Sequence, residues 1–214
     1  MGPRDDWDAW SSDFRSDLAV RPADAAVFDA ALSRALRAQG PVTLAGACAL
    51  ALREVGRVPP GDVATIAARA SARYAAAARL APHAVDVLAA LELLGVPFAI
   101  VGNGPEDMQR DVLRATGLDR RARVIVVSGA ADVAVRKPHP KVFWLATTGL
   151  GVRPADAIMI GDDLQADVLG AHRFGMATCW IAPPSADASE APAATVVVGS
   201  LAEAAAVIRE FARH

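Results

Sequence analysis

Residues 158–170 constrain this chain most, because they place acids directly after a short apolar run. Three apolar residues lead into Gly161, Asp162 and Asp163 follow at once, and Asp167 begins a new apolar pattern. A buried strand followed by carboxylates is typical of an open parallel sheet, which places its chemistry at the carboxyl ends of its strands. Adjacent like charges are costly unless a cation lies between them. The stretch therefore predicts an α/β site, with a strand ending in a solvated turn as the alternative.

Two motifs in this part of the chain carry a family resemblance. Residues 161–176 look like the fourth motif of the haloacid dehalogenase (HAD) superfamily, and residues 136–143 resemble the third. In that family the lysine of the third motif neutralises the nucleophile and the transferred group, a role that the resemblance implies for Lys137. The resemblance runs from about residue 80 to the C-terminus and implies an α/β fold, a HAD-like doubly wound parallel sheet (Rossmann-like) with a small helical cap. We expect residues 1–20 and 81–214 to form the core and residues 21–80 the cap.

The N-terminal segment departs from the family pattern, which opens with an apolar strand and Asp-x-Asp-Gly-Thr. In the preferred alignment residues 7–12 form the first strand, Asp13 stands at the position of the nucleophile, and Arg15 replaces the general acid and base. An alternative alignment uses Asp6 and Asp8 and keeps both carboxylates, but only five residues precede it. The nucleophile is therefore expected at Asp13, with Asp6 as the alternative.

The second motif of the family is a strand that ends in Ser or Thr, whose hydroxyl holds a phosphate oxygen. Gly102 stands in that place here, and Asn103 and Gly104 follow it. Backbone amides at the end of a strand and at the start of the next helix can still hold an anion. We therefore expect residues 102–104 to contribute to an anion site.

Apolar periodicity and turn residues predict the remaining elements. Helices are expected within residues 22–80, where Asp62 is a candidate N-cap, and over 84–94, 106–115, 141–149 and 201–212. Strands are expected over 98–101, 124–127, 157–160, 177–181 and 196–198.

Charge and composition exclude several classes of function. The net charge is −2 and the pI is about 6.1, which provides no electrostatic basis for binding nucleic acid or an anionic membrane. No apolar run approaches the roughly 18 to 20 residues of a membrane span, and the N-terminus lacks the apolar region of a secretory signal. Cys48 and Cys179 suggest no disulfide framework. We expect a cytoplasmic protein.

Three functional hypotheses follow from the kept and altered motif residues. In the first, the chain has lost phosphatase activity, because the general acid and the hydroxyl are missing. Its anion site would then support non-hydrolytic displacement of a sulfate or phosphate leaving group. The HAD-like components of azinomycin-type aziridine-forming enzymes, which close a ring with loss of sulfate beside a small partner protein, resemble this case. The catalytic residues would be Asp13, Lys137 and Asp162, and the anion would be bound by Arg15, Gly102, Asn103, Gly104 and Lys137.

The second hypothesis is a magnesium-dependent phosphohydrolase that acts on a small phosphate ester. No cofactor is expected under the first hypothesis, whereas Asp162 and Asp163 would hold Mg²⁺ under this one. The substrate, free or attached to a carrier protein, would bear a sulfate or phosphate group. The third hypothesis is an inert subunit, in which Trp7, Trp10 and Phe14 contact a protein partner or a second copy instead of packing against the core.

Overall fold

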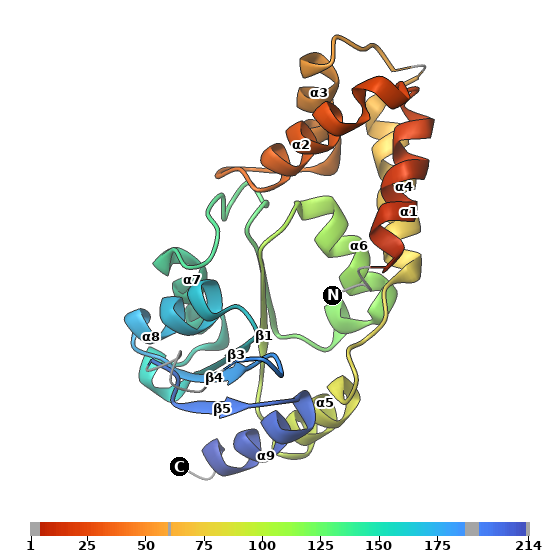
Figure 1. Cartoon of the computed structure of the whole chain (residues 1–214). Coiled ribbons are helices and arrows are strands. Elements are labelled where there is room, and N and C mark those ends of the chain that lie inside the picture. The colour runs from red at the N-terminus through yellow and green to blue at the C-terminus, as the bar shows by residue number, and fades with distance from the viewer. Residues whose placement is uncertain (1–4, 60, 187–192, 213–214) are drawn as a thin grey trace. The chain divides into compact units, whose positions relative to one another are not determined.

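The computed structural model describes residues 5–59, 61–186 and 193–212, and the chain divides into two compact units (Figure 1). The first, which we call the helical unit, comprises Met1–Arg79, Gly102–Arg121 and Val127–Val135. The second, the sheet unit, comprises Leu80–Val101, Ala122–Val126 and Arg136–His214. The chain crosses between them several times, so residues close in sequence can belong to different units.

The helical unit buries one apolar cluster among its helices. Its elements are α1 (Asp5–Asp17), α2 (Ala25–Leu36), α3 (Leu44–Glu54), α4 (Val63–Ala77) and α6 (Glu106–Thr116), with short 3₁₀ turns at η1 (Pro22–Asp24) and η2 (Leu118–Arg120). Helices α2, α3 and α4 fall where the apolar spacing predicts helices, and the side chain of Asp62 accepts the N–H of Thr65 as the expected N-cap of α4. The hydroxyl and N–H of Thr65 both donate to this carboxylate and lower the pKa of Asp62.

Helix α1 corrects the sequence analysis. Residues 7–12 are helical, so the first strand expected there is wrong. Trp10 and Phe14 are buried in the cluster with residues of α2, α3 and α4, and the indole N–H of Trp10 donates to the carbonyl of Ala70 at 2.7 Å. Burial of this apolar face outweighs any tendency of the segment to extend. The N-terminal segment therefore packs with the helices, whereas we expected residues 1–20 to join the α/β core.

Burial also accounts for the N-terminal aromatic side chains. Trp7 stacks on Trp10 with ring centroids 4.8 Å apart, and both rings meet Tyr74 edge-on. Trp7 remains 38% exposed, whereas Trp10 and Phe14 are buried. Trp10 and Phe14 are therefore part of the core of the helical unit, and their rings are too buried to form a contact surface for a partner.

The sheet unit contains two small sheets and the helices that connect their strands. Strand β1 (Ala99–Gly102) pairs with β2 (Val124–Val127), and β3 (Ile158–Gly161), β4 (Ala177–Ile181) and β5 (Val196–Val198) form a second sheet in that order. The β3–β4 and β4–β5 pairs are parallel, with Ile158 opposite Ala177 and Cys179 opposite Val196. The connecting elements are α5 (Ala84–Leu93), α7 (Pro140–Leu150), η3 (Pro154–Asp156), the π-helical turn η4 (Leu164–Leu169), α8 (Gly170–Phe174) and α9 (Leu201–Phe211).

The two sheets leave one edge each of β1 and β3 without a strand partner among the residues that the structure describes. Every strand expected from the sequence after residue 80 is present, within one residue of its predicted bounds. The parallel pairing brings the carboxyl ends of β3, β4 and β5 to one side of their sheet. Residues that follow β3 thus lie where such sheets bind ligands.

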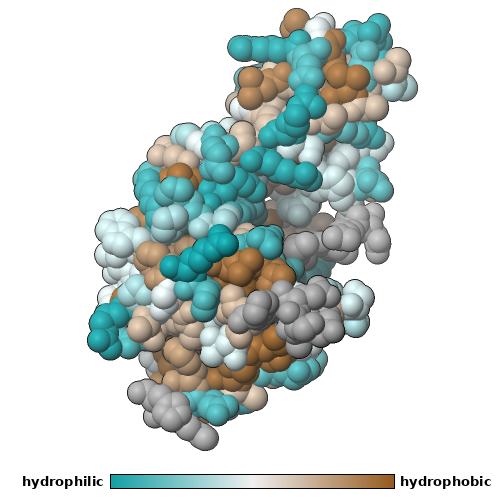
Figure 2. Space-filling model, turned by 60° about the vertical axis from the view of Figure 1, so that its left-hand side comes forward, coloured by the Kyte–Doolittle hydropathy of each residue, from teal (hydrophilic) through white to brown (hydrophobic). Residues whose placement is uncertain are grey.

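The surface carries scattered apolar residues. Val58, Leu93 and Trp144 are well exposed, and the face drawn in Figure 2 mixes hydrophobic and hydrophilic residues. Single exposed apolar side chains are normal on a folded domain. In the described part of the chain, no helix has the length and hydropathy needed to cross a membrane.

Candidate functional site

A buried ion pair lies just beyond the sheet unit's third strand. The Nζ atom of Lys137 is 2.6 Å from Oδ1 of Asp167, and the same ammonium donates to the backbone carbonyl of Val101 at 2.7 Å. The two charged side chains are only 11% and 6% exposed. Lys137 therefore links the end of β1 to η4, and its charge is held in a nearly dry environment, where it acts strongly on any anion that reaches it.

Asp167 is the partner that sequence analysis left without a role. Its Oδ2 atom also accepts the N–H of Asp163 at 3.2 Å, which fixes the turn after β3. The signal in the sequence is a carboxylate inside an apolar pattern, where Asp167 is 4% exposed and Val168 is 1% exposed. A buried carboxylate in such a pattern requires a cationic or hydrogen-bonding partner, and Lys137 supplies the charge.

Gly161 makes room for this carboxylate. A Cβ atom at position 161 would lie 2.6 Å from Cβ of Asp167 and would overlap its carboxyl group. Glycine is thus required by the close approach of η4 to the end of β3. Only a residue without a side chain lets Asp167 reach Lys137.

We predict that Gly161→Ala destabilises the sheet unit by about 1–3 kcal/mol, the usual cost of overpacking a filled site. Gly199→Ala is the matched control, because the nearest atom to its added Cβ is Oε1 of Glu203 at 3.5 Å. Urea unfolding of both variants measures the difference. Equal midpoints for the two variants would contradict the close contact.

The side chain of Asp163 is a helix cap, a role that was not expected from the sequence. Its Oδ1 atom accepts the N–H of Gln165 at 3.0 Å and that of Ala166 at 2.8 Å, so the side chain caps the start of η4. One oxygen of this expected metal ligand is therefore already bound to the backbone. A cap and a metal ligand compete for the same lone pairs.

Asp162 and Asp163 are both exposed, but only Asp163 caps a helical turn. Asp162 lies at the end of β3, and its backbone carbonyl accepts the indole N–H of Trp180 at 3.1 Å. Within residues 5–59, 61–186 and 193–212, no three His, Cys, Asp or Glu side chains converge as a metal site. The donor set fits only an ion such as Mg²⁺, which keeps several waters and takes one or two carboxylates together with substrate phosphates. Asp162 is the residue that would hold it.

The glycine-rich turn after β1 belongs to the helical unit. The N–H of Gly104 donates to Oγ of Ser128 at 3.0 Å, and Ser128 is buried. This amide, expected to hold an anion, is thus occupied by a hydroxyl within the protein. A Cβ at Gly102 or Gly104 would lie within 3.0 Å of the carboxamide of Gln109, a neighbour that sequence analysis missed.

Asp13 and Arg15 lie on α1, apart from any strand. Asp13 is exposed, and Arg15 forms an ion pair with Asp29 at 2.6 Å. Arg15 also lines a cavity of about 420 Å³, together with residues that include Trp7, Asp29 and Arg37. The pairing with Asp29 neutralises the guanidinium that we expected to hold an oxyanion. The nucleophile position predicted for Asp13 rested on the strand over residues 7–12, and without that strand it lacks a structural basis.

The sequence-based candidates belong to both units of the chain. Lys137, Asp162 and Asp163 lie in the sheet unit near Asp167. The other candidates lie in the helical unit, on α1 or in the turn after β1: Asp13, Arg15, Gly102, Asn103 and Gly104.

A protein-family model matches most of the chain. The model described as a haloacid dehalogenase-like hydrolase matches residues 20–175. Among curated proteins, a phosphoserine phosphatase of Thermus thermophilus is 35% identical over 133 residues, which are 61% of this chain and 51% of that protein. A glyceraldehyde 3-phosphate phosphatase of Methanopyrus kandleri is 34% identical over 100 residues, 47% of this chain and 42% of that protein. The chain spans about half the length of these relatives.

Solved structures show the same fold. A HAD phosphatase from Thermococcus onnurineus aligns with a TM-score of 0.70 and 23% identity, covering 94% of this chain and 86% of that one. The HAD-hydrolase YfnB from Bacillus subtilis, bound to magnesium, aligns with a TM-score of 0.59 and 22% identity, covering 95% and 93%. At this level of identity the likeness concerns the fold alone.

Proposed function

Since the chain belongs to the haloacid dehalogenase-like hydrolase family, we propose that it takes part in the magnesium-dependent hydrolysis of a small phosphate ester. This is the second hypothesis of the sequence analysis. The observation that carries it is the buried ammonium of Lys137, held at 2.6 Å from Asp167 and 2.7 Å from the carbonyl of Val101. A fixed cation with little access to water is suited to a dianionic phosphoryl group.

The named relatives support a phosphate ester as substrate. Proteins similar to this chain are named for phosphoserine, glyceraldehyde 3-phosphate and phosphoglycolate, all small molecules with one phosphate group. The substrate class proposed for this chain is therefore a small phosphomonoester. The names of these relatives favour hydrolysis over the displacement of a leaving group without water.

Three residues of the sheet unit take part in the proposed chemistry. Lys137 offsets the negative charge of the phosphoryl group, and Asp167 keeps the ammonium in place through its ion pair. The exposed carboxylate of Asp162 would hold Mg²⁺ or take the proton of an attacking water. Mg²⁺, when bound, would neutralise charge that develops on the phosphoryl oxygens.

The test is a phosphate-release assay with a panel of phosphoserine, glyceraldehyde 3-phosphate and phosphoglycolate, with and without Mg²⁺. We expect activity that needs Mg²⁺, and we expect Asp162→Asn to need at least about tenfold more of the metal, since even residues behind the ligands change affinity by about 10–100-fold. Asp156→Asn is the control, because Asp156 is an exposed acid paired with Arg153. No phosphate release from any ester would overturn the proposal.

The same assay tests the nucleophile that the sequence predicts. We expect Asp13→Asn to keep the activity of the wild type, because Asp13 is exposed on a helix. Loss of all activity in this variant, with an unchanged circular dichroism spectrum, would show that Asp13 is part of the active site.

A further inference from the structure

A cavity of about 420 Å³ lies in the helical unit, between α1 and α2. Its lining residues come from α1, within residues 7–15, and from α2 with its C-cap Arg37, within residues 29–37. On each helix these residues follow the spacing of one helix face, so the two faces form opposite walls of the cavity. A cavity of this size can enclose a small organic molecule, since ligand pockets span about 300–1,000 Å³.

Part of the cavity wall is apolar. The indole ring of Trp7 stacks on that of Trp10, yet Trp7 stays 38% exposed, so part of its ring remains open to a ligand. Leu32 and Leu36 of α2 add aliphatic surface. An apolar group of a ligand leaves water when it packs against such a wall, and an aromatic ring can also stack on the indole. The cavity therefore favours a ligand with a large apolar part.

The charged side chains of the cavity fall into two kinds. Arg15 and Asp29 form an ion pair at 2.6 Å and neutralise each other. Asp8 and Arg37 also line the cavity, but neither side chain forms a hydrogen bond or an ion pair with any residue that the structure describes. The cavity thus presents one carboxylate and one guanidinium that have no partner in the described part of the chain.

Asp8 and Arg37 lie on opposite walls, and both lie away from the ion pair. Asp8 stands about two turns before Arg15 on α1, at about 3.6 residues per turn. Arg37 stands about two turns after Asp29 on α2, by the same spacing. A ligand in the cavity can therefore meet a carboxylate from one wall and a guanidinium from the other.

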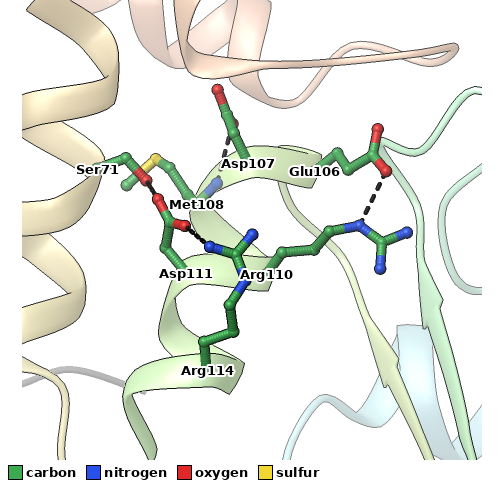
Figure 3. Close-up of polar contacts among 7 residues, drawn as sticks. All are labelled: Ser71, Glu106, Asp107, Met108, Arg110, Asp111 and Arg114. Atoms are coloured by element: carbon green, nitrogen blue, oxygen red, sulfur yellow. Dashed lines mark hydrogen bonds and ion pairs between the residues drawn. The ribbon is translucent and has the colours of Figure 1, made fainter. Parts of the chain in front are cut away.

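The charged side chains of α6, also in the helical unit, show the opposite arrangement (Figure 3). Asp111 accepts the hydroxyl of Ser71 at 2.5 Å and pairs with Arg114 at 2.7 Å. Arg110 pairs with Glu106 at 2.9 Å. These charges are balanced inside the protein. Opposite charges that lack such contacts and line one cavity have capacity for a ligand with charges of its own.

We propose that this cavity binds an α-amino acid with a large apolar side chain, which places its ammonium group next to Asp8 and its carboxylate next to Arg37. The apolar side chain packs against Trp7. A zwitterion matches the cavity because it brings one group of each sign to the two groups left without a protein partner. An organic acid or an amine would satisfy only one of them. Such binding uses no residue to which the proposed hydrolysis is assigned.

Calorimetry on the whole chain measures the affinity for L-phenylalanine and L-leucine. Two truncated probes test the recognition of each charged group, since phenethylamine lacks the carboxylate and 3-phenylpropionate lacks the ammonium group. We expect phenylalanine to bind about 10–100-fold more tightly than either probe, the range for one hydrogen bond to a charged group. Because Trp7 lines the cavity, we expect binding to change the tryptophan fluorescence as well.

Two variants each remove one of the proposed contacts. Arg37→Gln is expected to bind phenylalanine about 10–100-fold more weakly than the wild type does, and no better than it binds phenethylamine. Asp8→Asn is expected to bind phenylalanine no better than 3-phenylpropionate. Arg34→Gln on α2 and Asp13→Asn on α1 are the matched controls, because both side chains are exposed and neither lines the cavity. We expect both controls to bind phenylalanine within about twofold of the wild type.

The outcomes distinguish this inference from the proposed function. A wild type that binds neither amino acid overturns the inference, and so does equal affinity of the wild type and Arg37→Gln for phenylalanine. Equal affinity of the wild type for phenylalanine and 3-phenylpropionate overturns it as well, because the cavity would then accept any apolar acid. All three results leave the proposed function standing. A wild type that binds phenylalanine but releases no phosphate from any ester overturns the proposed function alone.

Discussion

Lys137→Ala is expected to destabilise the sheet unit by about 3–5 kcal/mol, because it leaves the carboxylate of Asp167 buried without its cation. The two side chains are 11% and 6% exposed, so little water can replace the lost partner. Urea unfolding measures the loss. Lys141→Ala is the matched control, because it removes the other lysine of the same short segment while the buried ion pair stays intact.

A double variant distinguishes the effect of Lys137 on stability from its effect on catalysis. In Lys137→Ala with Asp167→Asn the buried negative charge is gone, and we expect most of the lost stability to return. Phosphate release should stay about 100- to 1,000-fold below that of the wild type, since the cation that faces the phosphoryl group is still missing. Recovery of activity together with stability would mean that Lys137 only supports the fold.

Phe14→Ala is expected to destabilise the helical unit by about 3–5 kcal/mol, the usual cost of truncating a fully buried phenylalanine. Phe14 is completely buried, and it lies against Trp10 with ring centroids 5.1 Å apart. The expected loss follows from the packing of α1 in the helical cluster and would not follow if residues 7–12 formed a strand elsewhere.

Asp13→Ala is the control for this prediction. It changes the neighbouring residue on the exposed side of α1, and we expect stability within about 0.5 kcal/mol of the wild type. Denaturant unfolding followed by circular dichroism reports both variants. A small loss in Phe14→Ala, similar to that of Asp13→Ala, would show that α1 does not pack as described.

The apolar spacing of the N-terminal segment predicts the helix that the structure contains. Trp7, Trp10, Phe14 and Leu18 recur at intervals of three, four and four residues, which is the spacing of one helix face. The acids of this segment also align with a family motif, and that alignment requires a strand. Periodicity was the better guide, because burial of the apolar face decides whether such a segment is helical.

The role of Asp163 could have been predicted from local sequence alone. An aspartate immediately before a helical pattern is a strong N-cap signal, and the side chain of Asp163 accepts two backbone N–H groups at the start of η4. The resemblance to the fourth motif implies metal binding by Asp163 and says nothing of this capping role. Asp162, next to it, has no such local use and remains the candidate ligand for Mg²⁺.

The sequence by itself determined the α/β class, the family and nearly every element after residue 20, because apolar periodicity, caps and turn residues act between near neighbours. Only the tertiary structure decided that Lys137 pairs with Asp167 and that Gln109 fills the space beside Gly102. Lys137 and Asp167 are thirty residues apart, and their pairing depends on how β1 and η4 approach each other. No local pattern encodes that distance, so the chemistry of the site follows from packing.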